Sequence, residues 1–194
     1  MEFGYLDAAS IISCTTPSTK HQTRASYEIK TFINVYKPKI IKKFLRRVVF
    51  CGRLSKHGFS FFRGTYNLKN KTIFVEIDNF DDTSWVLHHE FSSLLFYELP
   101  HRFNKAKWKS YNGAEYKRNW HIISAGWEDN KKLQQKGFLY PYSQYTLEDD
   151  FNVMSGLYLA NKLKYTKMIA SARRFPRING KYILLRNFYK GLLR

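Results

Sequence analysis

The chain has 194 residues, of which 44% are hydrophobic and 18% aromatic, so it can bury a core and does not have the composition of a disordered chain. Lys and Arg number 33 against 15 Asp and Glu, which gives a formal net charge of +18. No apolar run reaches the roughly 18 residues that a membrane-spanning helix needs. Two cysteines are too few for a disulfide scaffold or a cysteine-rich zinc site.

The basic excess has two interpretations. It could mark a surface for nucleic acid or another polyanion. It could also be compositional drift, because Lys, Asn, Ile, Phe and Tyr are all abundant and basic pairs such as Lys42-Lys43 and Arg173-Arg174 are spread along the chain. We favour drift and do not expect nucleic acid as the partner. A basic polyanion-binding domain stays open as an alternative function.

Residues 1–26 are predicted to be a flexible N-terminal segment. The short apolar stretch Ala8–Cys14 ends with a small residue before a cysteine, as a bacterial lipoprotein signal does, although Glu2 and Asp7 stand where that signal has positive charge. Cys14 is therefore a candidate for lipidation, with a plain thiol as the alternative. The polar stretch Thr15–Arg24 is typical of a linker.

The first half of the chain predicts helices and then strands. Apolar residues follow helical spacing over Tyr27–Cys51 with a break before Pro38, which indicates two helices or one broken helix. Phe59–Tyr66 and Thr72–Ile77 are predicted strands joined by a turn at Asn67–Asn70.

The second half predicts helices around a long loop. A helix over Ser84–Leu99 is apolar over most of its circumference, which is typical of a buried helix. His101–Gly137 is polar, aromatic and irregular, as functional loops often are. Thr146 is expected to cap a further helix, with an acid three residues later.

Near the C-terminus, Tyr165–Arg174 predicts another helix that ends before Pro176. The pair Asn179-Gly180 predicts a turn. The following Tyr182–Leu193 is compatible with a strand or with a closing helix.

The helix over Ser84–Leu99 contains His88-His89-Glu90-Phe91-Ser92-Ser93. A zinc-protease helix has two ligands one turn apart and a glutamate next to the first, so that the glutamate reaches the metal-bound water. His89 and Glu90 occupy the first two of these places. Position 93 should hold the second ligand, but it holds a serine, whose hydroxyl is a poor zinc ligand.

A later segment extends this pattern. Gly137-Phe138-Leu139-Tyr140-Pro141-Tyr142 is followed by Glu148-Asp149-Asp150. Together with the histidine-glutamate helix, it resembles the zinc metallopeptidase lipoproteins of Bacteroidetes that accompany outer-membrane substrate import. The spacing of seven residues from the tyrosine to the acid also resembles that of anthrax-lethal-factor-like metallopeptidases.

The resemblance implies a role for each matching residue. His89 and Asp149 would be zinc ligands, Glu90 the general base, and Tyr142 the donor that stabilises the oxyanion. With Ser93 in place of a histidine, zinc binding should lose several kcal/mol of the roughly 10–16 typical of complete structural sites. Zinc is thus the expected cofactor, held weakly.

Other residues could take part in such a site. His88 points about 100° away from His89 around the helix, so we expect it to be packed or to support a ligand. His101 or His121 could supply the missing ligand. Glu148 and Asp150 are rivals of Asp149, with capping and charging of the helix start as their alternative role.

The sequence therefore predicts an α+β, zincin-like fold in which a small sheet packs against the histidine-glutamate helix and the acidic-start helix, in a single domain over residues 27–194. The leading function is a zinc-dependent metallohydrolase or metallopeptidase acting on a peptide or protein, atypical and a candidate for an inactive enzyme because Ser93 replaces a metal-ligand histidine. The alternative is a non-catalytic cell-envelope protein that keeps the peptidase cleft for binding. The resemblance implies a lipoprotein or periplasmic protein that works beside an outer-membrane import system; a cytoplasmic location is the alternative.

Overall fold

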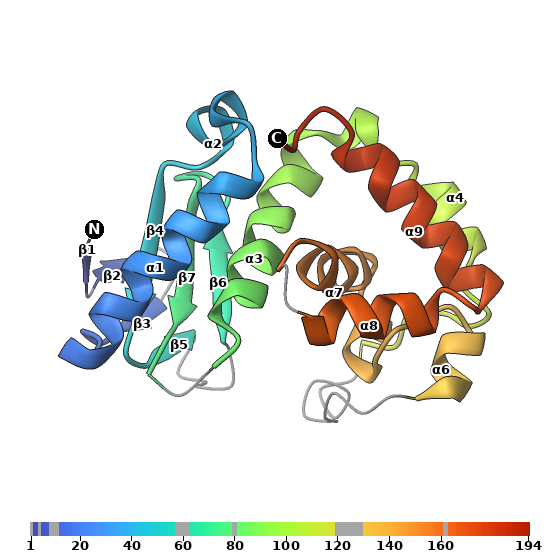
Figure 1. Cartoon of the computed structure of the whole chain (residues 1–194), viewed down its shortest axis with the longest axis horizontal. Helices are drawn as coiled ribbons and strands as arrows, with labels where there is room; N and C mark the ends of the chain where they lie inside the picture. The colour runs from blue at the N-terminus through green and yellow to red at the C-terminus, as the bar shows by residue number, and fades with distance from the viewer. Residues whose placement is uncertain are drawn as a thin grey trace. The chain divides into compact units, whose positions relative to one another are not determined.

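The computed structural model of the chain describes residues 2–3, 5–7, 12–56, 63–78, 81–118, 130–160 and 163–194. The chain divides into two compact units. The N-terminal unit comprises Met1–Leu95 and Leu192–Arg194, and the C-terminal unit comprises Phe96–Gly191. Helices and small sheets are both present, which confirms the α+β class (Figure 1). The prediction of one domain over residues 27–194 stays a prediction.

The N-terminal unit contains two small sheets. Their strands are β1 (Glu2–Phe3), β2 (Tyr5–Asp7), β3 (Ile12–Cys14), β4 (Arg47–Cys51), β5 (Leu54–Lys56), β6 (Gly64–Asn67) and β7 (Thr72–Glu76). One sheet has the order β1-β4-β7-β6 and the other β2-β3-β5. β4 and β7 are parallel, with Arg47 opposite Thr72, whereas β6 runs antiparallel to β7. The predicted hairpin is confirmed; the part of its first strand over residues 59–62 lies outside the described residues.

Both faces of the larger sheet are covered. The β-branched and aromatic residues of β4 and β7 favour strands and alternate between the faces. Val49, Cys51 and Phe74 form a buried cluster with Ile12 and Leu54 of the smaller sheet. The helices of the unit are α1 (Thr19–Val35), α2 (Pro38–Phe44) and α3 (Thr83–Glu98), which continues into the C-terminal unit.

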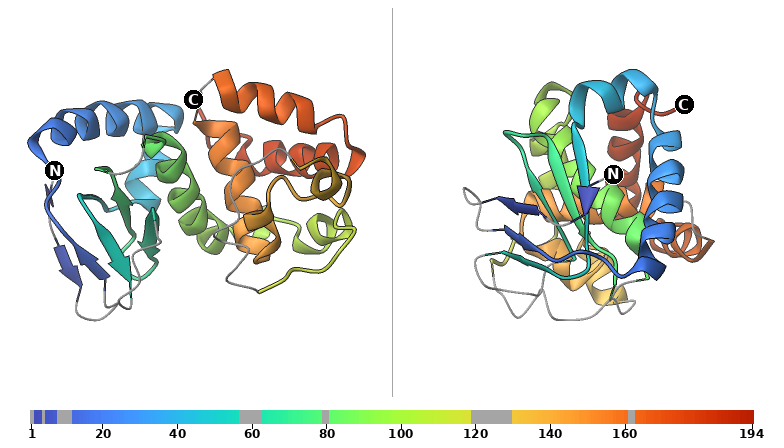
Figure 2. Two further views of the ribbon diagram at one scale, coloured as in Figure 1. Left: turned by 90° about the horizontal axis from the view of Figure 1, so that it is seen from below. Right: turned by 90° about the vertical axis from the view of Figure 1, so that its left-hand side faces the viewer.

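Helix α1 runs along one side of the strands in the left view of Figure 2, and it meets α3 through side chains. Their contact is aromatic, with the ring centroids of Phe32 and Phe91 5.5 Å apart. The break before Pro38 and the long buried helix are confirmed. Residues 47–51, however, form a strand rather than more helix, because Val48-Val49-Phe50 favours a pleated, buried position in the sheet.

Much of the expected linker is helical. α1 begins at Thr19, so both Thr15–Arg24 and the boundary expected at residue 26 run into it. Hydrogen bonds connect the start of α1 to residues that follow β7. The backbone N–H of Ser18 donates to the Asp78 carboxylate, and Arg24 donates to the Thr83 hydroxyl at 2.9 Å. These contacts join residues about sixty positions apart, so local sequence could not indicate them.

Cys14 and Cys51 form a disulfide, with their Cα atoms 5.1 Å apart. The expectation that Cys14 is a lipidation site is therefore wrong for this structure, because a lipid thioether needs the same sulfur atom. The plain-thiol alternative is wrong for the same reason. The bond joins β3 to the end of β4 across 37 positions of sequence.

The C-terminal unit is built from helices. They are α4 (Lys105–Ser110), α6 (Lys131–Gln135), α7 (Leu147–Leu159), α8 (Leu163–Ala172) and α9 (Pro176–Tyr189), with 3₁₀ helices η1 (Pro100–Arg102) and η2 (Pro141–Gln144). Its core is aromatic: Phe151 of α7 lies 4.8 Å from Phe103 and 5.0 Å from Phe188 between ring centroids. Among the described residues, no helix has the length and apolar character needed to cross a bilayer.

Two predictions for this unit need correction. The segment His101–Gly137 contains helices α4 and α6 rather than irregular chain alone, although residues 119–129 lie outside the described residues. Asn179-Gly180 lies inside α9 and makes no turn. Gly180 serves close packing instead, since a Cβ there would lie 2.3 Å from the Tyr111 ring. The predicted helix before Pro176 is confirmed as α8.

Candidate functional site

The histidine-glutamate motif lies in the buried middle of α3. His88, His89, Glu90 and Ser93 are each at most 7% exposed. The helix is buried because apolar residues surround the motif on every side, among them Leu87, Phe91, Leu94 and Leu95. The site side chains therefore project from a rigid element of the N-terminal unit.

His88 is a packed histidine. Its ring lies against the rings of Phe32 and Tyr36, and Nδ1 is 2.9 Å from the Tyr36 hydroxyl. Burial lowers the pKa of His88 to about 3, so the imidazole is neutral at ordinary pH. The hydrogen bond to Tyr36 explains why the polar His88 ring can be buried here. The His88 side chain is directed toward Phe32 of α1 and Tyr36 at its C-terminal end.

His89 has the chemistry that a metal ligand requires. Its ring packs on Trp85, with the centroids 4.6 Å apart, and burial lowers its pKa to about 3. A neutral imidazole is the form that coordinates zinc. The next residue, Glu90, lies against β6: a Cβ on Gly64 would be 2.7 Å from Glu90 Oε1. Only a glycine lets this strand pass so close to the carboxylate.

Ser93 stands at the position where the resemblance implies a second ligand. It lies four residues after His89, and residues at this spacing share one helix face. Ser93 is 1% exposed, so a hydroxyl is built into the buried face where a zincin helix would carry an imidazole. The neighbouring Ser92 hydroxyl instead donates to the His89 carbonyl at 2.6 Å.

The structure brings Tyr142 and Asp149 together within the C-terminal unit. Thr146 caps α7 by accepting from the Asp149 backbone N–H at 3.1 Å, and its hydroxyl contacts the Asp149 carboxylate, which confirms the predicted cap. Tyr142 also hydrogen-bonds this carboxylate. Burial raises the pKa of Asp149 to about 6, against the lowering effect of the two hydroxyl hydrogen bonds.

Asp150 and Glu148, the rivals of Asp149, have other partners. Asp150 Oδ2 accepts from Trp108 Nε1 at 2.8 Å, from the Tyr116 hydroxyl at 2.9 Å and from Lys181 Nζ at 2.6 Å. Lys181 and Asp150 are 0% and 1% exposed. Glu148 accepts from the Tyr97 hydroxyl at 2.6 Å. Asp150 is therefore part of a buried polar cluster, which the sequence did not indicate.

The buried cluster also holds the tyrosine-bearing segment. Lys181 Nζ donates to the Gly137 carbonyl at 2.6 Å as well as to Asp150. Gly137 has a φ of +88°, and a Cβ there would lie 2.3 Å from the Tyr111 carbonyl oxygen. Lys181 thus links the start of the Gly137–Tyr142 segment to the first turn of α7.

The residues present do not complete a conventional zinc set. Within the described part of either unit, no three His, Cys, Asp or Glu side chains form a group that could hold a metal ion. His101 lies exposed in η1, and His121 lies outside the described residues. His89 and Asp149 have suitable chemistry, but position 93 offers only a hydroxyl, which is a poor zinc ligand.

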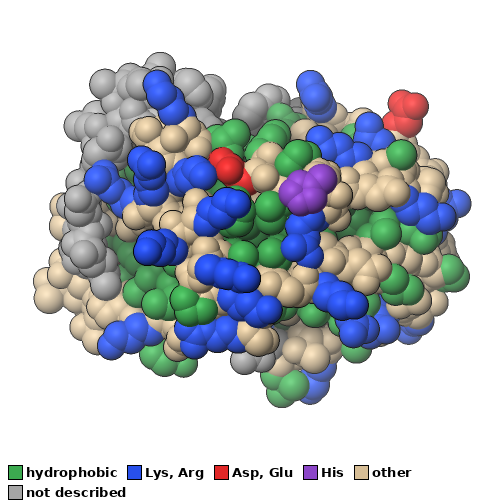
Figure 3. Space-filling view, turned by 90° about the horizontal axis from the view of Figure 1, so that it is seen from above, with side chains coloured by type: hydrophobic (Ala, Val, Ile, Leu, Met, Phe, Trp, Pro, Cys, Tyr) green, Lys and Arg blue, Asp and Glu red, His purple; other side chains and the backbone are tan. Residues whose placement is uncertain are grey.

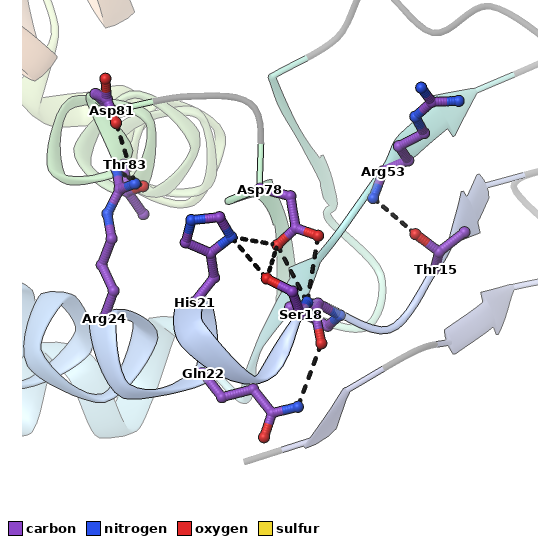
Figure 4. A network of polar contacts seen from close by, with 10 residues as sticks. Thr15, Ser18, His21, Gln22, Arg24, Arg53, Asp78, Asp81 and Thr83 are labelled. Carbon is purple, nitrogen blue, oxygen red and sulfur yellow. Dashed lines mark hydrogen bonds and ion pairs between the residues drawn. The ribbon is translucent and has the colours of Figure 1, made fainter.

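A second cluster, Ser18–His21–Asp78, superficially resembles a nucleophile triad (Figure 4). The Ser18 hydroxyl lies 2.9 Å and Asp78 Oδ1 2.8 Å from the same ring nitrogen, His21 Nδ1. A triad needs the serine and the acid on opposite ring nitrogens. The cluster therefore holds the start of α1 against the end of β7 and is not a candidate for nucleophilic catalysis.

Comparison with known proteins agrees with the motif. The model of the family described as "Putative zinc-binding metallo-peptidase" matches residues 22–190. A solved structure described as a putative zinc-binding metallo-peptidase from Bacteroides caccae is similar in fold, with a TM-score of 0.56 and 15% sequence identity over 88% of this chain and 68% of that one. No curated protein matches the chain. Because the family match spans most of the sequence, the chain belongs to the putative zinc-binding metallo-peptidase family.

Proposed function

We propose that this chain is an atypical, zincin-like member of its family that binds zinc weakly and has lost efficient peptide hydrolysis. The observation that carries the proposal is Ser93, buried one helical turn after His89 on the face that should present two imidazoles. A zinc peptidase needs three protein ligands and one open position. Removing one ligand from such a set weakens metal binding by orders of magnitude.

The remaining residues retain the roles that the lethal-factor-like arrangement assigns. His89 would supply the neutral imidazole and Asp149 the carboxylate, and bound zinc would polarise a substrate carbonyl and lower the pKa of a water. Glu90 would accept a proton from that water. Tyr142 would donate a hydrogen bond to a developing oxyanion. In the structure, Tyr142 and Thr146 orient the Asp149 carboxylate, which supports its place in this scheme.

The experiment is zinc titration by calorimetry on chelator-stripped protein. We expect wild type to bind zinc at micromolar affinity or weaker, and Ser93→His to gain at least 10-fold. Ser93→Gln is the size-matched control without an imidazole and should gain nothing. Adding Asp149→Asn to Ser93→His should abolish the gain. If folded Ser93→His, verified by circular dichroism, binds zinc no better than wild type, the site assignment is wrong.

We propose further that the protein works in the cell envelope, where it binds peptides beside an outer-membrane import system. The Cys14–Cys51 disulfide supports this location, because such bonds persist in oxidising compartments and are rare in the cytosol. Family membership supports a peptide ligand. Fractionation of native cells with alkylation of free thiols tests the location: oxidised protein in the periplasmic fraction is expected, and reduced protein in the cytosol would contradict it.

A further inference from the structure

One end of the N-terminal unit concentrates positive charge. Between Ile29 and Val75 the sequence contains no Asp or Glu. The exposed or half-buried basic side chains of α2, of the start of β4 and of the β6–β7 turn make up what we call the basic end: Lys37, Lys39, Lys42, Lys43, Arg46, Arg47, Lys69 and Lys71.

Backbone contacts hold these segments together. The Arg46 N–H donates to the Lys71 carbonyl at 2.9 Å, and Lys71 Nζ donates to the Lys43 carbonyl at 3.2 Å. The ammonium groups of Lys43 and Lys71 lie 5.1 and 5.6 Å from the centre of the Phe44 ring. Figure 3 looks onto the face that carries α2, where Lys and Arg side chains gather with few acidic ones among them.

Two acidic residues near the larger sheet, Glu76 and Asp78, follow the ends of its strands, whereas Glu2 of β1 lies opposite Val49 of β4. β4 and β7 are parallel, so the basic end lies where both begin, and Glu76 and Asp78 lie where they finish. Five residues of strand span about 16 Å, which exceeds the Debye length of about 8 Å at physiological ionic strength. Arg63 pairs with Glu76 and His21 with Asp78 at that far end. Glu76 and Asp78 therefore neutralise little of the charge at the basic end.

An exposed apolar residue lies at the tip of the basic end. Leu68 is 37% exposed in the β6–β7 turn, directly before Lys69. Lys71, with a φ of +50°, closes this turn. A basic surface around a partly exposed leucine combines two interactions that hold a protein on an anionic bilayer, namely attraction to lipid phosphates and insertion of an apolar side chain.

We propose that the basic end of the N-terminal unit docks on an anionic phospholipid bilayer, with Leu68 inserted at the headgroup level. A bilayer fits better than a nucleic acid, because a nucleic-acid surface would leave Leu68 without an apolar environment. The disulfide also favours a compartment in which lipid phosphates are the accessible polyanions. This proposal does not depend on the peptidase site, since none of its residues belongs to the zinc motif.

The test is vesicle binding by the full-length protein at 100 mM salt. We expect binding to vesicles with 30% phosphatidylglycerol and none to pure phosphatidylcholine. Each basic side chain near an anionic surface contributes about 1 kcal/mol, so Lys39→Gln/Lys42→Gln/Lys69→Gln should weaken binding about 100-fold. These three side chains are exposed, and the substitutions should leave the thermal midpoint nearly unchanged.

A matched control removes the same charge elsewhere. Lys131→Gln/Lys132→Gln/Lys136→Gln changes three exposed lysines of the C-terminal unit, and its binding should stay within 3-fold of wild type. Leu68→Ser should weaken binding to phosphatidylglycerol vesicles roughly 10-fold and leave heparin binding unchanged. The proposal would be overturned if the two triple-lysine variants lost vesicle affinity equally, or if the wild type did not bind vesicles. It would also be overturned if Leu68→Ser kept full vesicle binding and the protein bound duplex DNA tightly.

Discussion

At the scale of single residues, His88 shows how burial sets chemistry. Its folded-state pKa is about 3, against 6.5 for an exposed histidine. Below pH 6.5, His88 is therefore protonated in the unfolded chain, whereas in the folded chain it stays neutral until the pH approaches 3. The stabilising effect of a neutral His88 is fully present above pH 6.5 and is lost as the pH falls toward 3.

We predict that His88→Asn reduces the acid sensitivity of folding. One such histidine contributes a slope of about 1.4 kcal/mol per pH unit between roughly pH 6 and 4, and His89 adds to it in the same direction. Urea denaturation of metal-free protein across this range should give a slope lower by about that amount in the variant. An unchanged slope, whatever the loss of absolute stability, would contradict the prediction.

At the scale of elements, the Lys181–Asp150 pair joins three helices and a turn. Lys181 comes from α9, Asp150 from α7 and Trp108 from α4, and the Gly137 carbonyl completes the cluster. Burial raises the pKa of Asp150 and lowers that of Lys181, because it disfavours the charged form of each group, and their ion pair acts on each pKa in the opposite direction.

We predict that Lys181→Met destabilises the protein by about 3–5 kcal/mol, because it leaves the Asp150 charge buried without its counter-ion. Lys181→Met combined with Asp150→Asn should recover part of that loss, giving a coupling energy of about 1–3 kcal/mol in a double-mutant cycle. Equilibrium urea denaturation of the four proteins measures this. Strict additivity of the two substitutions would show that the pair is not coupled.

At the scale of the whole molecule, the disulfide restricts the chain more than any contact that local sequence suggests. Its two cysteines are 37 positions apart, and the loop that it closes contains α1, α2 and most of β4. The entropy removed from the unfolded chain by a loop of this length corresponds to about 4 kcal/mol in the simple polymer model.

We predict that Cys14→Ala/Cys51→Ala lowers the free energy of unfolding by about 3–4 kcal/mol. Reduction of the wild type with dithiothreitol should have a similar effect, and adding dithiothreitol to the double variant should have none. The difference between oxidised and reduced wild type in urea denaturation is the direct measurement. Equal stability of the two forms would show that the bond does not constrain the unfolded chain.

Local patterns were sufficient for the elements that carry the motif. The apolar circumference of α3, the β-branched run of β7 and the Thr146 cap of α7 are decided by residues close in sequence, and all three predictions are confirmed. The motif also indicated the family, because the helix and the tyrosine-acid segment occur in the right order. That His89 and Asp149 share one metal stays a prediction.

The sequence by itself determined the helix that carries His89 and Glu90, and together with the tyrosine-acid segment it indicated the family. Tertiary structure alone decided the partners: Cys51 for Cys14, Tyr36 for His88, and Lys181 for Asp150 rather than for its neighbour Asp149. Helical spacing follows from short-range sterics and side-chain periodicity, which a local window contains. Pairing between residues 31 to 52 positions apart depends on how the elements pack, and no local window contains that information.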